Sequence, residues 1–288
     1  MIATPLPTMN TLSSSAYQID LDAYLERIGY TGTTSATLDT LRSLHLLHTQ
    51  AIPFENLDPL LNRPVLLGLP AIEAKLVHSR RGGYCYEHNQ LFSHVLGRLG
   101  FTVTDLAARV LLAQPDYTLS PRSHMLLLVR LDQRRYIADV GFGGNTLTVP
   151  LLIDTEAAQE TPHGTYRALH VQGDFLLQVL VQGEWQSLYR FELTEQFPVD
   201  YVAINHYLST CDASHFRQSL LLALATAGGR HTMFNDKLTT RTADGELERI
   251  QVGSADEAAG LLQTVFGINV PDRNAFTTAW SRILEQTT

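Results

Sequence analysis

The sequence predicts an α+β protein in which helices and strands occupy separate stretches of the chain. Apolar residues recur at helical spacing through the first hundred residues, and strand-like apolar runs take over from residue 101. Asp132-Gln133, Gly173-Asp174 and Gly183-Glu184 separate pairs of these runs and predict hairpins. We therefore expect a mainly helical first part, then an antiparallel sheet or barrel, and a last part that mixes both types.

Four helices are expected in the first hundred residues. Asp20 can cap the first helix, and Gly29 can end it. Pro53 stops the second, because proline lacks a backbone donor and clashes with the preceding turn. The four helices cover residues 21–28, about 35–49, 71–78 and a run that begins at Cys85.

The remaining elements follow from short apolar runs and their turn residues. Asp244-Gly245 is a strong hairpin signal in the last part of the chain. The capping box at 254–257 opens a helical run over 258–266, and Asp272 can cap a final helix with Phe276 and Trp280 in the core. The strands are expected at residues 101–112, 124–131, 134–142, 166–171, 175–181, 185–191, 237–242 and 247–252.

Composition excludes several classes of protein. The chain has 288 residues and a formal net charge of −8, which argues against a general nucleic-acid or anionic-membrane binder. No run reaches the roughly 18 apolar residues that a membrane span needs. Residues 1–15 lack the features of a signal peptide and are expected to form a short disordered lead-in. Cys85 and Cys211 imply no disulfide framework and no zinc site, so we expect a cytoplasmic protein without a metal.

The most informative stretch runs from Arg81 to Asn89. Cys85 follows two glycines and opens an apolar run of helical spacing, which places it in the first turn of a helix. The unpaired N–H groups and positive dipole end of a helix favour a thiolate there. The glycines let the backbone turn sharply and approach a substrate. An isolated cysteine is more often a small buried hydrophobe, but these neighbours favour a nucleophile.

A cysteine nucleophile needs a base, and the base needs an orienting partner. His124 opens the first strand of the hairpin that turns at Asp132-Gln133. With a two-residue loop, Leu126 faces Asp139, and His124 lies diagonal to Asp139 on the same face. A slip of one residue would put the two on opposite faces. The hairpin alone leaves two interpretations open: an imidazole–carboxylate pair, or a strand-end histidine and a solvated aspartate.

Several residues around these motifs are candidates for supporting roles. Glu55 lies among apolar residues and needs a charge partner, because a buried unpaired carboxylate is costly. We expect Arg81 to be that partner, in a bidentate pair that braces the cysteine loop. Phe54 and Phe142 can each be a core residue or a substrate wall. The glycine-rich run at 141–144 fits a backbone turn beside a ligand better than a phosphate cradle.

Together these motifs resemble the arylamine N-acetyltransferases. The cysteine, histidine and aspartate occur in the order that the family has, at intervals of 39 and 15 residues (124 − 85 and 139 − 124). Weaker matches at 185–191, 205–210 and 266–268 extend the resemblance over roughly residues 18 to 280. The strong matches are Arg81-Gly82-Gly83-x-Cys85-x-Glu87-x-Asn89, the HMLLLV segment from His124, Asp139-Val140-Gly141-Phe142-Gly143 and Phe54-Glu55-Asn56-Leu57.

The resemblance implies a helical bundle over residues 1–100, a central antiparallel β-barrel over 101–204 and a C-terminal α/β lid over 205–288. The first two parts would be arranged as in a papain-type cysteine protease. It also implies acetyl-CoA as donor and ping-pong transfer to an arylamine, hydrazine or N-hydroxyarylamine. The expected roles are the acetylated nucleophile for Cys85, proton transfer for His124 and orientation of the imidazole for Asp139, with backbone N–H groups near the cysteine holding the oxyanion.

The resemblance also implies where the substrates bind. Phe54 and Phe142 would line the acceptor pocket, whereas Ser123, Gly143 and Tyr207 would border the CoA cleft. The chain departs from some relatives at position 121 and from many at positions 211–212, so the detailed CoA contacts stay open. The choice among acetyl, propionyl and malonyl donors stays open as well.

Other functions compete with this one. The same three residues would serve a cysteine amidase, peptidase or transglutaminase, but a closed cleft lined by Phe54 and Phe142 argues against an acyl-peptide groove. A macrolactam-forming amide synthase, which takes its acyl group from a carrier, is a known offshoot of the same family. A degenerate binding protein is disfavoured because Cys85, His124 and Asp139 are all present.

Overall fold

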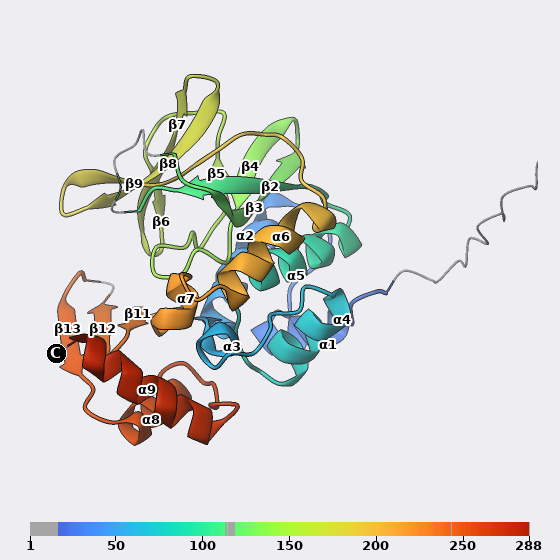
Figure 1. Cartoon of the computed structure of the whole chain (residues 1–288). Helices are drawn as coiled ribbons and strands as arrows, with labels where there is room; N and C mark the ends of the chain where they lie inside the picture. Colours follow the sequence, from blue (N-terminus) through green and yellow to red (C-terminus); the bar gives the residue numbers. More distant parts are fainter. Residues whose placement is uncertain (1–16, 113, 115–118, 243, 288) are drawn as a thin grey trace, which may run out of the picture.

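The computed structural model describes residues 17–112, 114, 119–242 and 244–287. A helical bundle, a barrel-like sheet and a smaller sheet backed by two helices lie against one another (Figure 1). The lead-in expected over residues 1–15 lies outside the described residues. Among the described helices, none is long and apolar enough to cross a membrane.

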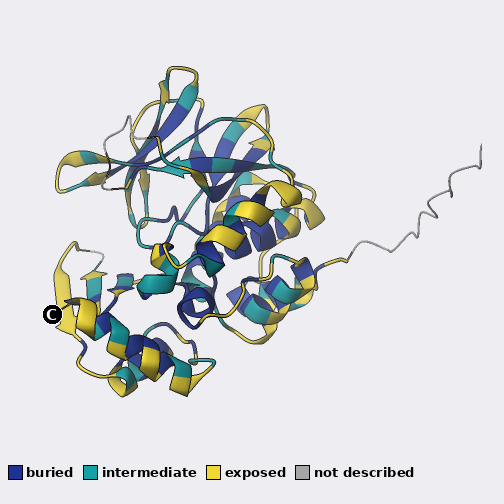
Figure 2. Ribbon diagram, viewed as in Figure 1, coloured by how far each residue is buried: buried dark blue, intermediate teal, exposed yellow. Residues whose placement is uncertain are grey.

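The N-terminal bundle packs around its last helix, α5. Buried residues line α5 along most of its length, and Phe92 and Leu96 belong to the same apolar core as Leu41 and Leu44 (Figure 2). This core stabilises the helix that begins at the candidate nucleophile. The helical elements are α1 (Leu21–Ile28), α2 (Leu38–Ala51), α3 (Leu57–Leu60), α4 (Leu69–Glu73), the π-helical turn η1 (Ala74–His78) and α5 (Cys85–Arg98).

The observed helix ends show which sequence signals were sufficient to predict where a helix begins or ends. Asp20 caps α1 and Gly29 ends it in a left-handed conformation, as predicted. The second helix begins at residue 38 rather than 35, because the side chain of Thr37 caps it by accepting from the amide of Thr40. The third expected helix is longer and irregular, since α4 begins at residue 69 and passes into the π-helical turn.

The central part is an eight-stranded antiparallel sheet that nearly closes into a barrel. Its strand order is β5-β4-β3-β2-β9-β8-β7-β6, and its interior is filled by apolar side chains such as Leu106, Leu126 and Leu188. The expected antiparallel barrel is therefore confirmed. The strands are β2 (Thr102–Val110), β3 (Arg122–Leu131), β4 (Arg134–Ala138), β5 (Leu151–Leu152), β6 (Gln159–Thr161), β7 (Gly164–Val171), β8 (Asp174–Val181) and β9 (Glu184–Phe191).

The hairpin turns confirm one predicted register and correct two others. Asp132 and Gln133 both have positive φ, and Leu131 pairs with Arg134 as expected. In the next two hairpins the turn residues are 172–173 and 182–183, one residue earlier than expected, because Gln172 and Gln182 adopt the positive φ that we had not assigned to them. All three loops have two residues.

One strand is shorter than its sequence indicates. We expected a strand over residues 134–142, but β4 ends at Ala138. The backbone then leaves the sheet toward α5, where the side-chain oxygen of Asn89 accepts a hydrogen bond from the amide of Val140 at 3.1 Å. Asp139 therefore lies just beyond the strand, at the junction of the barrel and the bundle.

The C-terminal part is a five-stranded sheet backed by two helices. Phe276 and Trp280 are buried between these helices and the sheet, as expected. β10 and β11 had not been predicted, because apolar and polar residues alternate only weakly along them. The elements are β1 (Phe54–Glu55), β10 (Leu221–Thr226), β11 (Gly229–Phe234), β12 (Lys237–Thr242), β13 (Leu247–Gln251), α8 (Ala255–Thr264) and α9 (Arg273–Thr287).

Two connections hold the three parts together. β1, from the first part of the chain, pairs with β10 of the lid through Phe54 and Ala223. The helix α6 (Pro198–Thr210) contributes Tyr201 and Leu208 to the core of the bundle, and α7 (His215–Gln218) follows it. The boundary expected at residue 204 falls inside α6.

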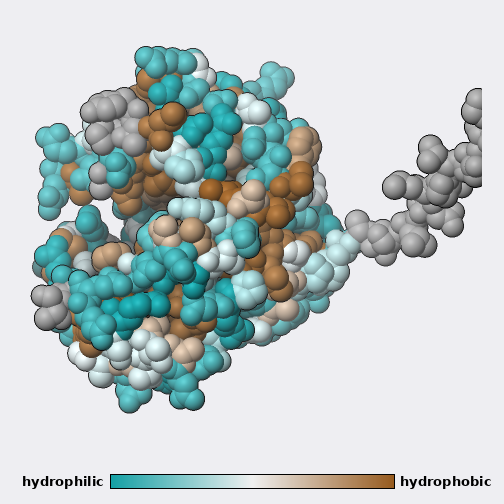
Figure 3. Space-filling view, viewed as in Figure 1, coloured by the Kyte–Doolittle hydropathy of each residue, from teal (hydrophilic) through white to brown (hydrophobic). Residues whose placement is uncertain are grey.

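The outer face of α6 leaves apolar side chains exposed, which are visible as brown atoms in Figure 3.

Candidate active site

Cys85 is the first residue of α5 and is nearly fully buried. The two glycines before it are required by close packing rather than by the sharp turn we expected, since neither has a positive φ. A Cβ on Gly82 would lie 1.9 Å from the carbonyl oxygen of Pro53. A Cβ on Gly83 would lie 2.6 Å from the carboxylate of Glu87, which itself accepts from the amide of Tyr84 at 3.0 Å.

A buried ion network supports the loop in front of the cysteine. Arg81 was expected to form a bidentate pair with Glu55. The partner is correct, but the guanidinium forks between two carboxylates, with Nη2 2.6 Å from Glu55 and Nη1 2.9 Å from Asp58. Lys75 joins the network at 2.7 Å from both Asp58 and Glu87. One basic group alone could not compensate the three carboxylates buried here.

The β3–β4 hairpin brings His124 and Asp139 together. Its register, observed from Leu127–Ala138 to Leu131–Arg134, is the one that the two-residue loop predicts. Nε2 of His124 donates to Oδ2 of Asp139 at 2.7 Å, and both side chains are buried. The interpretation as a strand-end histidine and a solvated aspartate is therefore excluded. Because Nε2 is engaged, Nδ1 is the ring nitrogen left for a second partner.

Asp139 receives four hydrogen bonds. Besides His124, the Asn89 amide donates to Oδ1 at 3.0 Å, the Gly141 amide to Oδ1 at 3.0 Å, and the Tyr189 hydroxyl to Oδ2 at 3.0 Å. Burial alone would raise the pKa of Asp139, but His124 and these donors lower it below its usual value. The carboxylate therefore stays charged although it is buried.

The electrostatics of His124 follow from its neighbours. Burial by itself would lower the pKa of His124, but the charge and hydrogen bond of Asp139, with smaller contributions from Cys85, raise it to about 10. The imidazole is therefore cationic at neutral pH. A cation beside a cysteine at a helix N-terminus favours the thiolate.

A cavity of about 230 Å³ opens onto these groups. Cys85 and His124 both contribute to its wall, so the sulfur and the imidazole face the same space. Phe54 and Phe142 line it as well, and the rings of Phe142 and His124 meet nearly perpendicular with 5.0 Å between their centroids. Both phenylalanines line the cavity, and their role as walls of a ligand pocket stays a prediction.

The three residues expected at the CoA cleft fall in different places. Ser123 and Gly143 line the cavity, and the carbonyl oxygen of Ser123 lies 3.9 Å from the sulfur of Cys85. Gly143 has a φ of 82°, a conformation that glycine adopts without strain. Tyr207 is exposed on α6 and is not among the residues that line the cavity, where Leu208 of the same helix lies instead.

The sequence and fold are similar to those of known proteins. The chain matches the N-acetyltransferase family model over residues 37–276. It is 43% identical over 259 residues to the arylamine N-acetyltransferase of Escherichia coli strain K12, covering 89% of this chain and 92% of that protein. The chain belongs to the arylamine N-acetyltransferase family.

Other arylamine N-acetyltransferases agree with this assignment. A Salmonella typhimurium relative, described as an arylamine N-acetyltransferase / N-hydroxyarylamine O-acetyltransferase, is 42% identical over 261 residues, covering 90% of this chain and 92% of that one. The solved structure of the Mycobacterium marinum enzyme in complex with CoA superimposes with a TM-score of 0.88 at 39% identity, over 92% of this chain and 99% of that one.

Three residues that position the site in this arylamine N-acetyltransferase family member were given no role from the sequence. Asn89 was quoted within a motif, and its spacing of one helical turn from Cys85 was the available signal. Tyr189 comes from β9, far from the hairpin in sequence. His45 contacts the carbonyl oxygens of Asp139 and Leu147 through Nε2 at 3.1 and 3.0 Å. Burial lowers the pKa of His45 to about 4, so this ring is neutral and donates to them.

No group of three or more histidine, cysteine, aspartate or glutamate side chains within the described ranges could hold a metal ion. The described part of the site offers ionisable side chains and backbone groups for catalysis.

Proposed function

We propose that this chain transfers an acetyl group from acetyl-CoA to an arylamine, hydrazine or N-hydroxyarylamine through a thioester on Cys85. One observation supports this most directly. The sulfur of Cys85 and the ring of His124 share a cavity, and Asp139 fixes that ring by a hydrogen bond of 2.7 Å. This is the arrangement that a cysteine nucleophile and its base require.

In the first half-reaction, the Cys85 thiolate attacks the carbonyl carbon of acetyl-CoA. The tetrahedral oxyanion would be held by backbone N–H groups at the start of α5, where the helix leaves such donors unpaired. The carbon–sulfur bond to CoA then breaks, and the CoA sulfur leaves with a proton from His124. Asp139 keeps the imidazole in one orientation and stabilises its charged form.

In the second half-reaction, the acceptor nitrogen attacks the thioester on Cys85. His124 has lost its proton in the first step and takes one from the attacking nitrogen. The nitrogen–carbon bond forms, the carbon–sulfur bond breaks, and the thiolate–imidazolium pair is restored. An aromatic amine suits this order, because it is weakly basic and arrives neutral at pH 7.

The acceptor would lie between the two phenylalanines. Phe54 and Phe142 are only partly buried and face the cavity, so an aromatic ring can pack against them. Ser123 and Gly143 are proposed to contact the pantetheine arm of the donor, since both line the same cavity as the sulfur. A cytoplasmic location stays a prediction from the sequence.

Intact-mass spectrometry tests the proposal. The chain is incubated with acetyl-CoA, and we expect one acetyl group on Cys85 that an added aniline or hydrazide removes. Cys85→Ser should prevent the adduct. Cys211→Ser is the matched control, because the Cys211 thiol is partly exposed and lies at the end of α6. It should acquire the adduct as the unchanged chain does.

Three results would contradict the proposal. An adduct that persists in Cys85→Ser but disappears in Cys211→Ser would show that Cys211 is the nucleophile. Discharge mainly by water, with no acetylated amine formed, would favour a cysteine amidase. An acyl group accepted only from a carrier protein would favour an amide synthase.

A further inference from the structure

A second cavity adjoins the one that contains Cys85. It lies between the barrel and the lid sheet and encloses about 270 Å³. Gly144 lines both cavities, so the two cavities adjoin at this glycine. A Cβ on Gly144 would lie 3.2 Å from the methyl group of Thr232, another lining residue. Figure 3 shows the outside of this region as a notch between the two lobes.

Two arginines from the lid line this second cavity. Arg230 of β11 and Arg241 of β12 are direct cross-strand partners. Like charges directly opposite one another destabilise a sheet. Among the described residues, neither guanidinium lies within ion-pairing distance of a carboxylate. The pair therefore places two positive charges together without a balancing anion.

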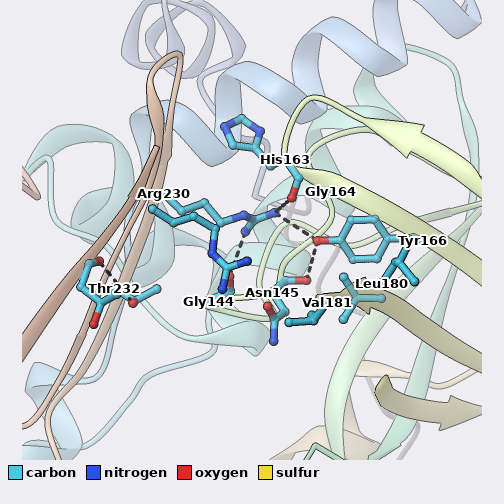
Figure 4. Close-up of a pocket in the computed structure, with 12 residues that line it drawn as sticks. Gly144, Asn145, His163, Gly164, Tyr166, Leu180, Val181, Arg230 and Thr232 are labelled. Atoms are coloured by element: carbon cyan, nitrogen blue, oxygen red, sulfur yellow. Dashed lines mark hydrogen bonds between the residues drawn. The ribbon is translucent and has the colours of Figure 1, made fainter. Parts of the chain in front are cut away.

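Arg230 is the more unusual of the two, because only 9% of it is exposed. Its guanidinium reaches across to the barrel side and donates to the carbonyl oxygen of Gly144 and the hydroxyl of Tyr166 (Figure 4). It also donates to the carbonyl oxygen of Thr146, so all three acceptors are neutral. These bonds hold the group in place but do not neutralise it. A buried charge is costly unless it is paired.

The other polar wall of the cavity does not supply a negative charge. His163 donates from Nε2 to the carbonyl oxygen of Thr226 at 2.7 Å, so its Nδ1 is left to accept from the hydroxyl of Thr148 at 3.1 Å. Both ring nitrogens are engaged. Tyr166 is buried and keeps its proton, which it directs at the carbonyl oxygens of Asn145 and Thr146.

We propose that Arg230 and Arg241 form an anion subsite that holds a phosphate group of the acyl-CoA donor. The proposal rests on the acetyl-CoA-dependent function above. The planar guanidinium matches a phosphate in geometry, and an entering phosphate would supply the missing negative charge. With a net charge of −8, the chain needs such a local positive region to attract an anionic donor.

The position of the subsite agrees with the shape of the donor. The reactive thioester must reach Cys85, whereas the phosphates lie at the far end of a long, flexible arm. The arm can enter past Gly144, with the thioester in one cavity and a phosphate in the other. A side chain at residue 144 would crowd this route, because its Cβ would lie 3.2 Å from the methyl group of Thr232.

Arg241→Gln is the variant for the test, because the Arg241 side chain is exposed on β12 of the lid. Arg134→Gln is the matched control, since Arg134 is an exposed arginine at the β3–β4 turn and its loss changes the net charge equally. We measure acylation of Cys85 by acetyl-CoA and by p-nitrophenyl acetate, which carries no phosphate. Arg241→Gln should raise the KM for acetyl-CoA about tenfold and leave acylation by p-nitrophenyl acetate unchanged.

Two further donors identify the phosphate. If the 3′-phosphate is bound, 3′-dephospho-acetyl-CoA should show the raised KM with the unchanged chain. If the diphosphate is bound, 3′-dephospho-acetyl-CoA should have the same KM as acetyl-CoA with the unchanged chain. Arg241→Gln should then still raise the KM for 3′-dephospho-acetyl-CoA. In either case inorganic phosphate should compete with acetyl-CoA in the unchanged chain and compete less in Arg241→Gln.

The subsite is refuted if Arg241→Gln and Arg134→Gln have the same KM for acetyl-CoA while both react with p-nitrophenyl acetate. In that event Arg230 is only a structural brace between the lid and the barrel. The failure of the proposed function looks different, because Cys85 would then acquire no acetyl group from acetyl-CoA in the unchanged chain.

Discussion

The side-chain amide of Asn89 joins the nucleophile helix to the carboxylate of the hairpin. Its nitrogen donates to Asp139 at 3.0 Å and to the carbonyl oxygen of Met125 at 2.7 Å, and its oxygen accepts from the amide of Val140 at 3.1 Å. Asn89 lies one helical turn after Cys85. One side chain therefore fixes the barrel hairpin relative to the helix that carries the sulfur.

We expect Asn89→Ala to lower both stability and activity. The change removes three buried hydrogen bonds, and unsatisfied buried groups cost about 1–3 kcal/mol each, so the free energy of unfolding should fall by at least about 2 kcal/mol. Urea denaturation measures this loss. Asn274→Ala on the exposed face of α9 is the control and should change little. Equal stability of the two variants would show that Asn89 does not join the two elements.

The hairpin shows how much local sequence can specify. A two-residue loop fixed the register, and the register put His124 and Asp139 on one face without knowledge of the rest of the chain. The caps of α1 and the helix that begins at Cys85 were equally local. Each prediction succeeded because the residues that decide the structure are neighbours in sequence.

The supporting contacts could not be found in this way. Tyr189 and His45 reach Asp139 from β9 and α2, and nothing in their own segments indicates it. β1 has two residues and exists because β10 pairs with it. Arg81 was assigned one carboxylate correctly, but its second partner, Asp58, lies on a short helix that the local pattern did not predict. Long-range packing decides these contacts.

The glycines before Cys85 differ from the glycine near the end of the same helix. Gly82→Ala should destabilise the chain and slow acylation of Cys85, because the new methyl group would lie 1.9 Å from the carbonyl oxygen of Pro53. Gly97→Ala is the matched control. Gly97 is exposed within α5, and a methyl group there would meet no neighbouring atom within 4 Å, so the variant should gain roughly 0.5–1 kcal/mol.

Thermal unfolding and acylation by acetyl-CoA compare these two glycine variants. We expect opposite shifts in Tm, with a loss for Gly82→Ala and a small gain for Gly97→Ala. Acylation should be impaired only in the first variant. A Gly82→Ala chain that is as stable and as active as the unchanged protein would mean that the contact with Pro53 does not position the cysteine loop.

The His124–Asp139 pair should make stability depend on pH in a predictable direction. Folding raises the pKa of His124 from 6.5 to about 10, despite burial, because Asp139 favours the charged ring. A raised pKa contributes stability that is complete below pH 6.5 and is lost as the pH rises through about 10. The pKa of Asp139 is lowered, so its contribution is present above its unfolded value and is lost in acid.

We therefore expect His124→Gln to cost more stability near neutral pH than in strong base. Denaturation by urea at about pH 6 and about pH 10.5 gives the difference in unfolding free energy between the variant and the unchanged chain at each pH. The difference should shrink at the higher pH, where most of the unchanged chain has lost the charge on His124. His206→Gln removes an exposed histidine on α6 and should give a small difference at both values. A penalty for His124→Gln that stays constant or grows with pH would mean that the ring is not held as a cation beside Asp139.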